Sequence, residues 1–209
     1  MKITVIGTGN MGSAFAKQLS TAGHTVRITG RDISKAKALA EQHANVSAYV
    51  ASEALSDSDV IVVATAYDDA AAALQSLGDL TGKVVVDITN PLSADYMSLT
   101  IGHVTSASEE IAKAVPQANV VKAFNTLFAQ VLADGPKFAN DQTGSVFVAS
   151  DSERAKQTAI ALARSLGWNT VDAGGLINAR YLEPLAGLNI YLGYGAGMGT
   201  SVAPVWLSK

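Results

Sequence analysis

Short runs of apolar, mostly β-branched residues recur along the first half of the chain. Five of these runs, at residues 3–6, 25–29, 46–50, 60–64 and 84–88, are nearly continuous rather than alternating. Continuous runs are typical of strands that helices cover on both faces, as in a parallel sheet. Stretches with helical spacing of apolar residues lie between them, at 11–22, 34–43, 51–55 and 69–77. This alternation predicts a doubly wound α/β fold.

Several of the expected helices carry capping residues at their ends. Ser34 stands where the second helix needs an N-cap, because its hydroxyl can accept a backbone N–H. Gly23 follows the first helix, where a residue in the left-handed region closes the last turn. Residues 151–153 are expected to cap an amphipathic helix that runs to Ser165 and is ended by Gly167.

The second half of the chain continues the pattern and then changes. Further strands are expected at 120–124, 146–149 and 170–172, so residues 1–175 are predicted to form one Rossmann-type domain with a mostly parallel sheet. From Leu176 a single helical stretch extends to about residue 192, and a glycine-rich tail follows it. Because no charged or proline-rich linker separates the two parts, residues 176–209 are predicted to be a small helical C-terminal region packed on the main domain.

Composition and charge narrow the classes of function. Of the 209 residues, 48% are hydrophobic and 16% are charged, which suits a globular domain with a sizeable core. Fifteen basic and eighteen acidic residues give a net charge of −3 without any basic run, which argues against nucleic acid or a membrane surface as a partner. No signal-peptide core and no stretch of roughly 18 apolar residues occurs, so a cytoplasmic location is expected.

Several kinds of chemistry are disfavoured by the residues available. Cysteine is absent, which excludes disulfides and thiolate ligands, and the three histidines, His24, His43 and His103, are scattered along the chain. No metal site is therefore expected. No tyrosine has a lysine four residues later and no Gly-x-Ser-x-Gly sequence occurs, so neither a tyrosine–lysine pair nor a serine nucleophile is predicted.

A glycine-rich turn follows the first expected strand and opens the first expected helix. It consists of Gly7, Thr8, Gly9, Asn10, Met11 and Gly12. In this position the pattern is typical of dinucleotide-binding folds, although a purely structural turn is the alternative. Gly7 permits the tight turn, Gly9 lets the backbone approach the pyrophosphate, and Gly12 lets the helix pack on the strand. The helix N-terminus then offers free N–H groups to the phosphates.

The end of the second expected strand bears on the choice between NAD and NADP. NAD enzymes place a carboxylate there to bind the adenosine ribose, whereas NADP needs a cation for the 2′-phosphate. Gly30 removes the acid, Arg31 supplies a guanidinium, and Lys35 adds a second charge on the same side. NADP(H) is therefore the predicted cofactor. Two alternatives stay open: Asp32 as the ribose-binding acid after a shift of one residue, and these residues as solvated loop charges.

Further short motifs are distributed along almost the whole chain, and their order is the one that a known family shows. Besides the glycine turn and Gly30-Arg31, they are Asp87-Ile88-Thr89-Asn90-Pro91-Leu92, Val121-Lys122-Ala123-Phe124-Asn125-Thr126, Asp172-Ala173-Gly174 and Ala179-Arg180-Tyr181-Leu182-Glu183-Pro184. This set resembles the coenzyme F420-dependent NADP oxidoreductases. The same type of domain is similar to the oxidoreductase portion of transmembrane ferric reductases. Residues 96–103 and 193–209 depart from the family pattern.

The resemblance implies hydride transfer between nicotinamide C4 and a deazaflavin (F420) or flavin ring as the second substrate. It also implies a homodimer and a C-terminal region that completes the acceptor pocket. Gly7 to Gly12 are implied to bind pyrophosphate, and Arg31 and Lys35 the 2′-phosphate. The residues implied to line the ribose and linker are Ala64, Thr65, Ala66 and Tyr67, and those implied to border the nicotinamide are Thr89, Asn90, Pro91, Ala123, Phe124 and Asn125.

Hydride transfer between stacked rings needs orientation more than an acid or a base. Asn90 and Asn125 are the predicted positioning residues, because an amide at the carboxyl edge of the sheet can hold the nicotinamide carboxamide. Asp87 is expected to be structural and to accept backbone N–H groups of the following turn. Arg180 and Glu183, three residues apart on a helix, are expected to form a surface pair.

Two other functions stay open. One is a small dehydrogenase or imine reductase, although the related pyrroline-carboxylate reductase and β-hydroxyacid dehydrogenase groups carry a long helical second domain for which residues 176–209 are too few. The other is a non-catalytic NADPH sensor. Tyr181, Tyr191 and Tyr194 are expected to pack the C-terminal helix rather than to stack on a second ring.

Overall fold

Within residues 1–207, which the computed structural model describes, six parallel strands form the main sheet. Their order is β3-β2-β1-β4-β5-β6, with β1 at Lys2–Ile6, β2 at Thr25–Thr29, β3 at Val46–Ala48, β4 at Val60–Val63, β5 at Val84–Asp87 and β6 at Asn119–Lys122. The strand order reverses between β1 and β4, which is the switch point of a doubly wound fold. The predicted Rossmann-type sheet is confirmed. Residues 208–209, the end of the expected C-terminal region, lie outside the described residues.

Alternate residues of the central strands enter two separate cores. In β4, Val60 and Val62 belong to one core, while Ile61 and Val63 belong to the other. The first core is closed by α1 (Asn10–Thr21), α2 (Ile33–Ala40), α6 (Ala129–Asp134) and α7 (Glu153–Ser165). The second is closed by α3 (Ala51–Ala54), α4 (Tyr67–Gln75) and α5 (Ala107–Ala114). Burial on both faces explains why the strands are continuously apolar.

Two of the expected strands form a sheet of their own. β7 (Ser145–Val148) and β8 (Asn169–Asp172) pair in parallel with each other, apart from the main sheet. A single antiparallel bridge between Lys122 and Ala149 connects this pair to the end of β6. Strand propensity predicts both strands, but it does not show which neighbour each one pairs with.

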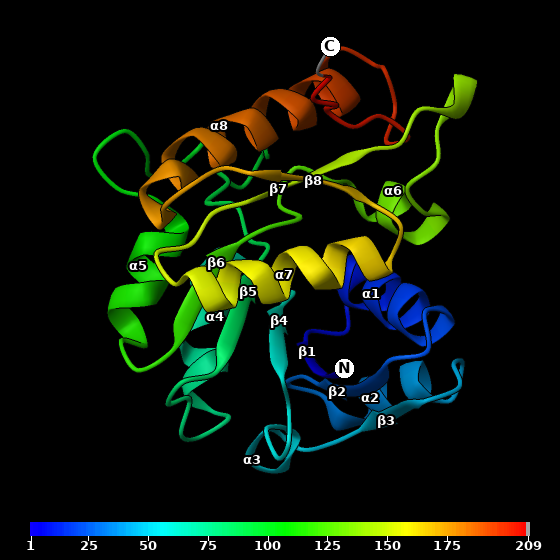
Figure 1. Ribbon diagram of the computed structural model, residues 1–209, viewed down its shortest axis with the longest axis vertical. Coiled ribbons are helices and arrows are strands. Elements are labelled where there is room, and N and C mark those ends of the chain that lie inside the picture. The colour runs from blue at the N-terminus through cyan, green and yellow to red at the C-terminus, as the bar shows by residue number, and fades with distance from the viewer. Residues whose placement is uncertain (208–209) are drawn as a thin grey trace.

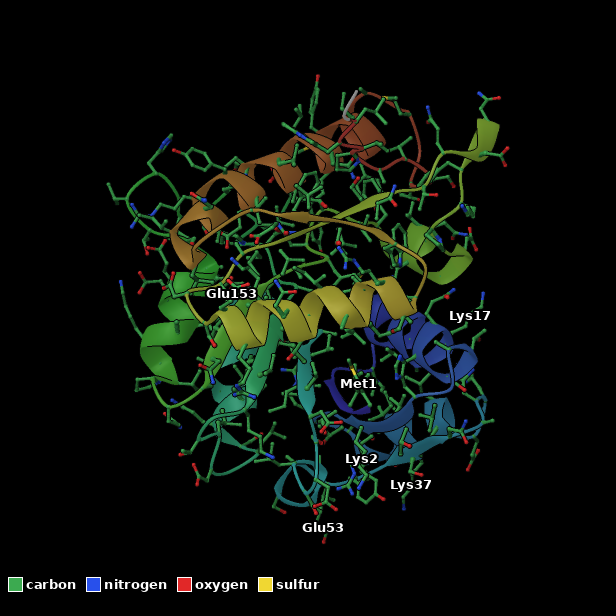
Figure 2. All side chains as sticks on the ribbon, viewed as in Figure 1. Met1, Lys2, Lys17, Lys37, Glu53 and Glu153 are labelled. Carbon is green, nitrogen blue, oxygen red and sulfur yellow. The ribbon has the colours of Figure 1, made fainter. Side chains whose placement is uncertain are left out.

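The C-terminal region lies over this small sheet. A 3-10 turn, η2 (Leu176–Asn178), leads into α8 (Ala179–Ile190), and a π-helical turn, η3 (Tyr191–Gly195), follows it; a second 3-10 turn, η1, spans Ala139–Asp141. Figure 1 shows α8 lying across β7 and β8, at the end of the molecule opposite β3. Phe147 of β7 packs there against Leu182 and Leu185 of α8. Side chains fill the space between α7 and α8 (Figure 2). A domain boundary at residue 175 stays a prediction.

The outward face of α8 is apolar and exposed to solvent. Tyr181 is 74% exposed, Leu188 55% and Tyr191 52%. The expectation that Tyr181 and Tyr191 pack the C-terminal helix is therefore wrong, because their side chains point away from the layer that α8 covers. The homodimer implied by the family resemblance stays a prediction, and it would cover this face if the two copies packed through α8. No helix within residues 1–207 is both long and apolar enough to cross a membrane.

Two helices, α5 and α6, have no counterpart among the sequence expectations. The start of α5 carries a signal in the sequence, because Ser106 is the N-cap and accepts the backbone N–H of Glu109, the acidic residue three positions later. The Glu109 side chain in turn accepts the Ser106 hydroxyl at 2.8 Å. The short helix α6 begins after Phe128 without a side-chain cap, so no comparable signal marks it.

The start of α2 differs from the prediction. The N-cap is Asp32, whose Oδ1 accepts the N–H groups of Ser34 at 2.9 Å and Lys35 at 3.4 Å. The prediction of Ser34 as the cap is wrong by two residues, because the carboxylate reaches the free N–H groups first. The other two capping predictions are confirmed: Gly23 has φ 78 after α1, and Ser152 caps α7.

Removal of the Asp32 carboxylate tests this cap. Asp32→Ala is expected to lower the free energy of unfolding by about 1 kcal/mol, the usual effect of losing a side-chain cap. Ser34→Ala, measured by the same urea titration, is the matched control and should leave stability unchanged within about 0.5 kcal/mol. A larger loss for Ser34→Ala than for Asp32→Ala would contradict the assignment.

Candidate functional site

A cavity of about 840 Å³ opens at the carboxyl edge of the main sheet. Its walls come from the turn after β1, from the segments after β4, β5 and β6, and from α8 with the π-helical turn that follows it. Doubly wound sheets bind ligands at this edge, beside the switch point. The predicted site residues that line the cavity are Gly9, Asn10, Met11, Ala64, Thr65, Ala66, Tyr67, Thr89, Asn90 and Asn125.

The other predicted site residues lie beneath or beside the cavity. They are Gly7, Thr8, Gly12, Gly30, Arg31, Lys35, Pro91, Ala123 and Phe124. Ala123 belongs to the first core and is completely buried, so its side chain does not border the cavity. Arg31 and Lys35 are exposed at the start of α2, to one side of it. The roles predicted for these residues stay predictions.

The glycine turn brings three backbone segments into contact. Gly7 has φ 125, and a Cβ on it would lie 2.2 Å from the carbonyl oxygen of Ala64. A Cβ on Gly12 would lie 2.0 Å from the carbonyl oxygen of Gly7, so neither position has room for a side chain. At Gly9 a Cβ would meet no protein atom within 4 Å, although Gly9 lines the cavity. The open space at Gly9 is therefore available to a ligand.

The N-terminus of α1 faces this open space with its positive charge uncompensated. Its N-cap, Gly9, makes no side-chain hydrogen bond, and its first turn contains no acidic residue. The first N–H groups of a helix need an acceptor, and the helix dipole favours a negative one. An anion such as a pyrophosphate fits this end of the helix.

An exposed cation, Arg31, lies at the start of α2 and forms an ion pair with α4. The Arg31 side chain is 90% exposed, and its Nη1 lies 3.6 Å from Oδ2 of Asp69 at the start of α4. Gly30 lies directly beside Thr8 of the glycine turn, since a Cβ on it would be 3.4 Å from the Thr8 methyl group. Asp32 is already used as a helix cap, which weakens the alternative of Asp32 as the ribose-binding acid.

The two predicted positioning residues meet at the ends of β5 and β6. Asn90 Nδ2 donates to the backbone oxygen of Asn125 at 2.8 Å, and Asn125 Nδ2 donates to Oδ1 of Asn90 at 3.0 Å. This arrangement leaves the buried Oδ1 of Asn125 without a partner, and the hydroxyls of Thr89 and Thr126 are unpartnered as well. All of these residues line the cavity. Buried polar atoms of this kind usually meet a ligand or a water molecule.

The backbone at the end of β6 is strained where it turns toward the cavity. Phe124 has φ 59, in the left-handed region that a bulky residue rarely adopts. Its ring is fully buried and packs edge-to-face on Phe15 of α1, with ring centroids 5.2 Å apart. This packing holds the strained turn, and Asn125 follows it directly. Strained residues of this type cluster at binding sites.

The end of the cavity near α8 is apolar and aromatic. Its walls include Leu92, Tyr96 and Met97 from the loop after β5 and Ala186, Asn189, Ile190 and Tyr194 from the C-terminal region. Tyr194 lines the cavity and packs edge-to-face on Phe128, another lining residue, with ring centroids 5.5 Å apart. It therefore does not pack the C-terminal helix as expected. Tyr96 and Met97 lie in residues 96–103, a segment that matches no family motif, so the sequence alone did not reveal them.

Charge is scarce along the cavity walls. Among residues 1–207, the charged residues that line the cavity are Asp68 and Asp95, and no Lys, Arg or His of this part of the chain lines it. His103 is the histidine nearest in the chain to a lining residue, but it is exposed and does not itself line the cavity. Burial raises the pKa of the Tyr67 hydroxyl above its ordinary value, and the carboxylates of Glu110 and Glu183 add to the shift. Tyr67 is therefore a neutral donor throughout the physiological pH range.

The predicted surface pair of Arg180 and Glu183 does not form. Arg180 instead binds Glu109 of α5 through two hydrogen bonds, of 2.9 Å and 2.7 Å. The hydrogen bond from Arg180 is the main cause that lowers the pKa of Glu109. Glu183 is 1% exposed and binds Lys122, which is also buried. The prediction is wrong because helical spacing does not show which face of α8 meets another helix.

Asp87 has the structural role expected of it, together with a further one. Its Oδ1 accepts the N–H of Thr89 at 2.8 Å, as predicted. Its Oδ2 accepts Lys122 Nζ at 2.8 Å and the hydroxyl of Ser108. Lys122 was not singled out from the sequence, although a lysine inside an apolar strand is an unusual residue that marks a buried ion pair. Within residues 1–207 no group of three or more metal-ligating side chains occurs.

Comparison with known proteins shows the family to which the chain is related. Residues 2–91 match the family described as NADP oxidoreductase, coenzyme F420-dependent. The chain is 31% identical to a proposed F420-dependent NADP reductase from Arthrobacter sp. FB24, whose crystal structure superposes over 100% of both chains with a TM-score of 0.89.

Relatives with other activities share part or all of the fold. Metalloreductase STEAP3 of Rattus norvegicus is 32% identical over 185 residues, which cover 88% of this chain and 36% of that protein. The chain thus spans about a third of the length of the metalloreductases that it matches. A reductive aminase from Aspergillus terreus in complex with NADPH and ethyl levulinate is 20% identical, with a TM-score of 0.66 over 94% of this chain and 62% of that one, which shows the common fold.

The open space at Gly9 predicts a variant that folds but binds poorly. Gly9→Ala is expected to weaken NADPH binding at least about tenfold, or about 1.4 kcal/mol, because its methyl group would occupy the path of the phosphates. The unfolding midpoint should stay at the wild-type value, since no protein atom lies within 4 Å of the added Cβ. Fluorescence titration and thermal unfolding measure the two quantities.

Two further glycine variants serve as controls for this experiment. Gly12→Ala should unfold at a lower temperature, because its Cβ would lie 2.0 Å from a backbone oxygen. Gly102→Ala adds a methyl group with equally open surroundings outside the cavity lining and should change neither quantity. Unchanged NADPH affinity in Gly9→Ala would show that the phosphates do not approach this turn.

Proposed function

Because the chain belongs to the coenzyme F420-dependent NADP oxidoreductase family, we propose that it transfers a hydride between NADP(H) and a flavin- or deazaflavin-like acceptor. It is an NADP-dependent oxidoreductase by its family. The proposal concerns the acceptor and the residues that hold the two ligands. One observation supports it: a single cavity borders the uncapped N-terminus of α1, residues whose buried polar atoms lack partners, and a group of aromatic side chains.

The residues at one side of the cavity fit a phosphorylated dinucleotide. The N-terminus of α1 and the open space at Gly9 suit the pyrophosphate. Arg31 and Lys35 suit the 2′-phosphate; the exposed Arg31 forms an ion pair with Asp69 at 3.6 Å, which a phosphate would have to share or replace. The Oδ1 of Asn125 has a free acceptor position for the amide hydrogens of the nicotinamide carboxamide.

Orientation is the chemical task that these residues perform. When bound, NADPH supplies the hydride from C4 of its nicotinamide ring, and the acceptor takes this hydride together with a proton from water. The polar groups at Asn90, Asn125 and Thr89 hold one ring, and the aromatic and apolar side chains near α8 hold the other. A fixed separation of the two rings lowers the barrier more than any single acid or base in this cavity.

The lining of the α8 end supports a planar, uncharged acceptor ring. Tyr96, Tyr194 and Phe128 offer aromatic faces and edges, while Thr126 and Asn189 offer neutral hydrogen-bonding groups. In the part of the chain that the structure describes, residues 1–207, the cavity lining contains no Lys, Arg or His, the side chains that usually bind the carboxylate of a hydroxy acid.

A second candidate is reduction of an imine. Asp68 and Asp95 are the charged residues that line the cavity, and carboxylates would favour a positively charged iminium carbon over a neutral ketone. The imine reductase and the reductive aminase that share the fold are longer proteins, and this chain covers 63% and 62% of their chains. The acceptor assay below separates this candidate from the first.

The acceptor proposal is tested by mixing the protein with NADPH and one acceptor at a time. FMN, riboflavin and F420 represent the proposed class, and a cyclic imine represents the second candidate. Loss of the nicotinamide absorbance band with a flavin-type acceptor is the expected result. Oxidation by the imine alone would replace the first candidate by the second. Tight NADPH binding without oxidation by any acceptor would instead favour a sensor.

Arg31→Ala tests the cofactor assignment separately. NADPH binding should weaken roughly 10- to 100-fold, the effect of losing one charged hydrogen bond, while NADH binding stays unchanged because NADH lacks the 2′-phosphate. Lys37→Ala removes one charge from the last turn of the same helix and is the matched control. Equal weakening of NADPH and NADH would remove Arg31 from the phosphate site. In that case a loss of NADH affinity in Asp32→Ala would identify Asp32 as the ribose ligand.

A further inference from the structure

Lys122, the last residue of β6, is a fully buried ammonium with every donor in use. Its Nζ donates to the backbone oxygen of Thr89 at 2.7 Å and to Oδ2 of Asp87 at 2.8 Å, and it lies 2.9 Å from Oε1 of Glu183. An ammonium has three protons, so these three acceptors satisfy it. A buried lysine is tolerated only when its partners are complete, which makes the arrangement of these groups strict.

The two carboxylates around Lys122 are held from other directions as well. Glu183 accepts the N–H groups of Ala107 at 2.9 Å and Ser108 at 3.2 Å, at the positive end of α5. Asp87 accepts the Ser108 hydroxyl and the N–H of Thr89. The cluster therefore joins β5, β6, α5 and α8 around one point, and its members are at most 1% exposed, apart from Thr89 at 4%.

The cluster contacts residues on two sides of the cavity, although the side chains of Lys122, Asp87 and Glu183 do not line it. On one side it holds Thr89 by its N–H and by its carbonyl oxygen, and the Thr89 hydroxyl remains unpartnered at the cavity. On the other side it holds α8 at Glu183, and Ala186 and Ile190, which follow on the same helical face, line the opposite wall. One ammonium thus connects the turn that borders the nicotinamide with the helix that borders the acceptor.

We propose that Lys122 is a positioning residue that sets the separation between the turn after β5 and helix α8, and thereby the distance between the two reacting rings. The proposal rests on the proposed function for its catalytic consequence. Hydride transfer depends steeply on the separation and alignment of donor and acceptor, so a small shift of one wall slows it strongly. Neither Lys122 nor Glu183 touches the ligands, because neither lines the cavity.

The test variant is the double substitution Lys122→Met with Glu183→Gln. It removes one positive and one negative charge together, keeps side chains of similar length, and leaves Asp87 with its bonds from Ser108 and Thr89. We expect kcat to fall about 100-fold while the Kd for NADPH changes less than about twofold, because the phosphate-binding end is untouched. With NADPH deuterated at the transferred position, the isotope effect on kcat should rise, since hydride transfer becomes the slow step.

The chain offers a matched control in the other charge pair of α8. Glu109→Gln with Arg180→Met also removes one bond set between α5 and α8 and one charge of each sign, but it does not touch Thr89. A general loosening of α8 would lower kcat in both double variants to the same extent. A positioning role of Lys122 predicts the large loss and the raised isotope effect in the first variant only. Thermal unfolding of both variants ensures that kcat is compared on folded protein.

The result that overturns the proposal is a folded Lys122→Met/Glu183→Gln variant with kcat within about twofold of wild type, or an equal loss in the control. Should the first variant fail to fold, Glu183→Gln alone, with Arg180→Met as its control, replaces it under the same criteria. Should wild type reduce no acceptor, the proposed function fails by itself. Amide hydrogen exchange then decides the positioning role: faster exchange at residues 88–90 in the first variant alone supports it, and unchanged exchange refutes it.

Discussion

Burial of the parallel sheet on both faces is the constraint on which the rest of the structure depends. Because helices close both sides of β1, β4 and β5, the faces of these strands have no room for polar chemistry. Ligand-binding groups are thereby confined to the edge where the strands end. The turn after β1 and the segments after β4, β5 and β6 all converge there, and each of them contributes residues to the cavity lining.

The parts of the site at this edge are distinct in their physical nature. The end of α1 acts through free N–H groups and the helix dipole, and it needs only glycine at Gly9 for access. The ends of β5 and β6 act through amide and hydroxyl groups, which the strained turn at Phe124 orients. The α8 end acts through aromatic surface. Such a division suits two ligands that must lie side by side in fixed orientation.

The C-terminal region supplies what the Rossmann sheet alone lacks. Helix α8 rests on the separate β7–β8 pair (Figure 1). Its inner face lines the cavity at Ala186, Asn189 and Ile190. Buried charge binds it to the sheet through Glu183 and Lys122, while partly exposed charge binds it to α5 through Arg180 and Glu109. The α8 layer thus forms the cavity wall that the strand ends do not provide.

Local pattern was sufficient for most of the sheet and for the dinucleotide turn. Every strand of the main sheet was predicted, with ends that differ from the observed ones by at most two residues, because an apolar run of four or five residues reports its own burial. The turn from Gly7 to Gly12 was predicted because Gly7 and Gly12 have no room for a side chain, and this requirement appears in the sequence as a fixed spacing of glycines. Helix α6 and the cap of α2 were missed or misplaced, since short helices and competing capping residues give weak or ambiguous local signals.

By itself, then, the sequence determined the fold class, the glycine turn and the set of residues at the strand ends, because each of these follows from the residue types within one short segment. Only the tertiary structure decided the partners of side chains far apart in the chain. The packing of α8 against α5 decides that Arg180 pairs with Glu109 and that Glu183 pairs with Lys122. The packing of the loop after β5 and of the C-terminal region decides that Tyr96 and Tyr194 line the cavity. The periodicity of a helix gives the spacing of its faces, whereas the neighbour that each face meets is set by the whole fold.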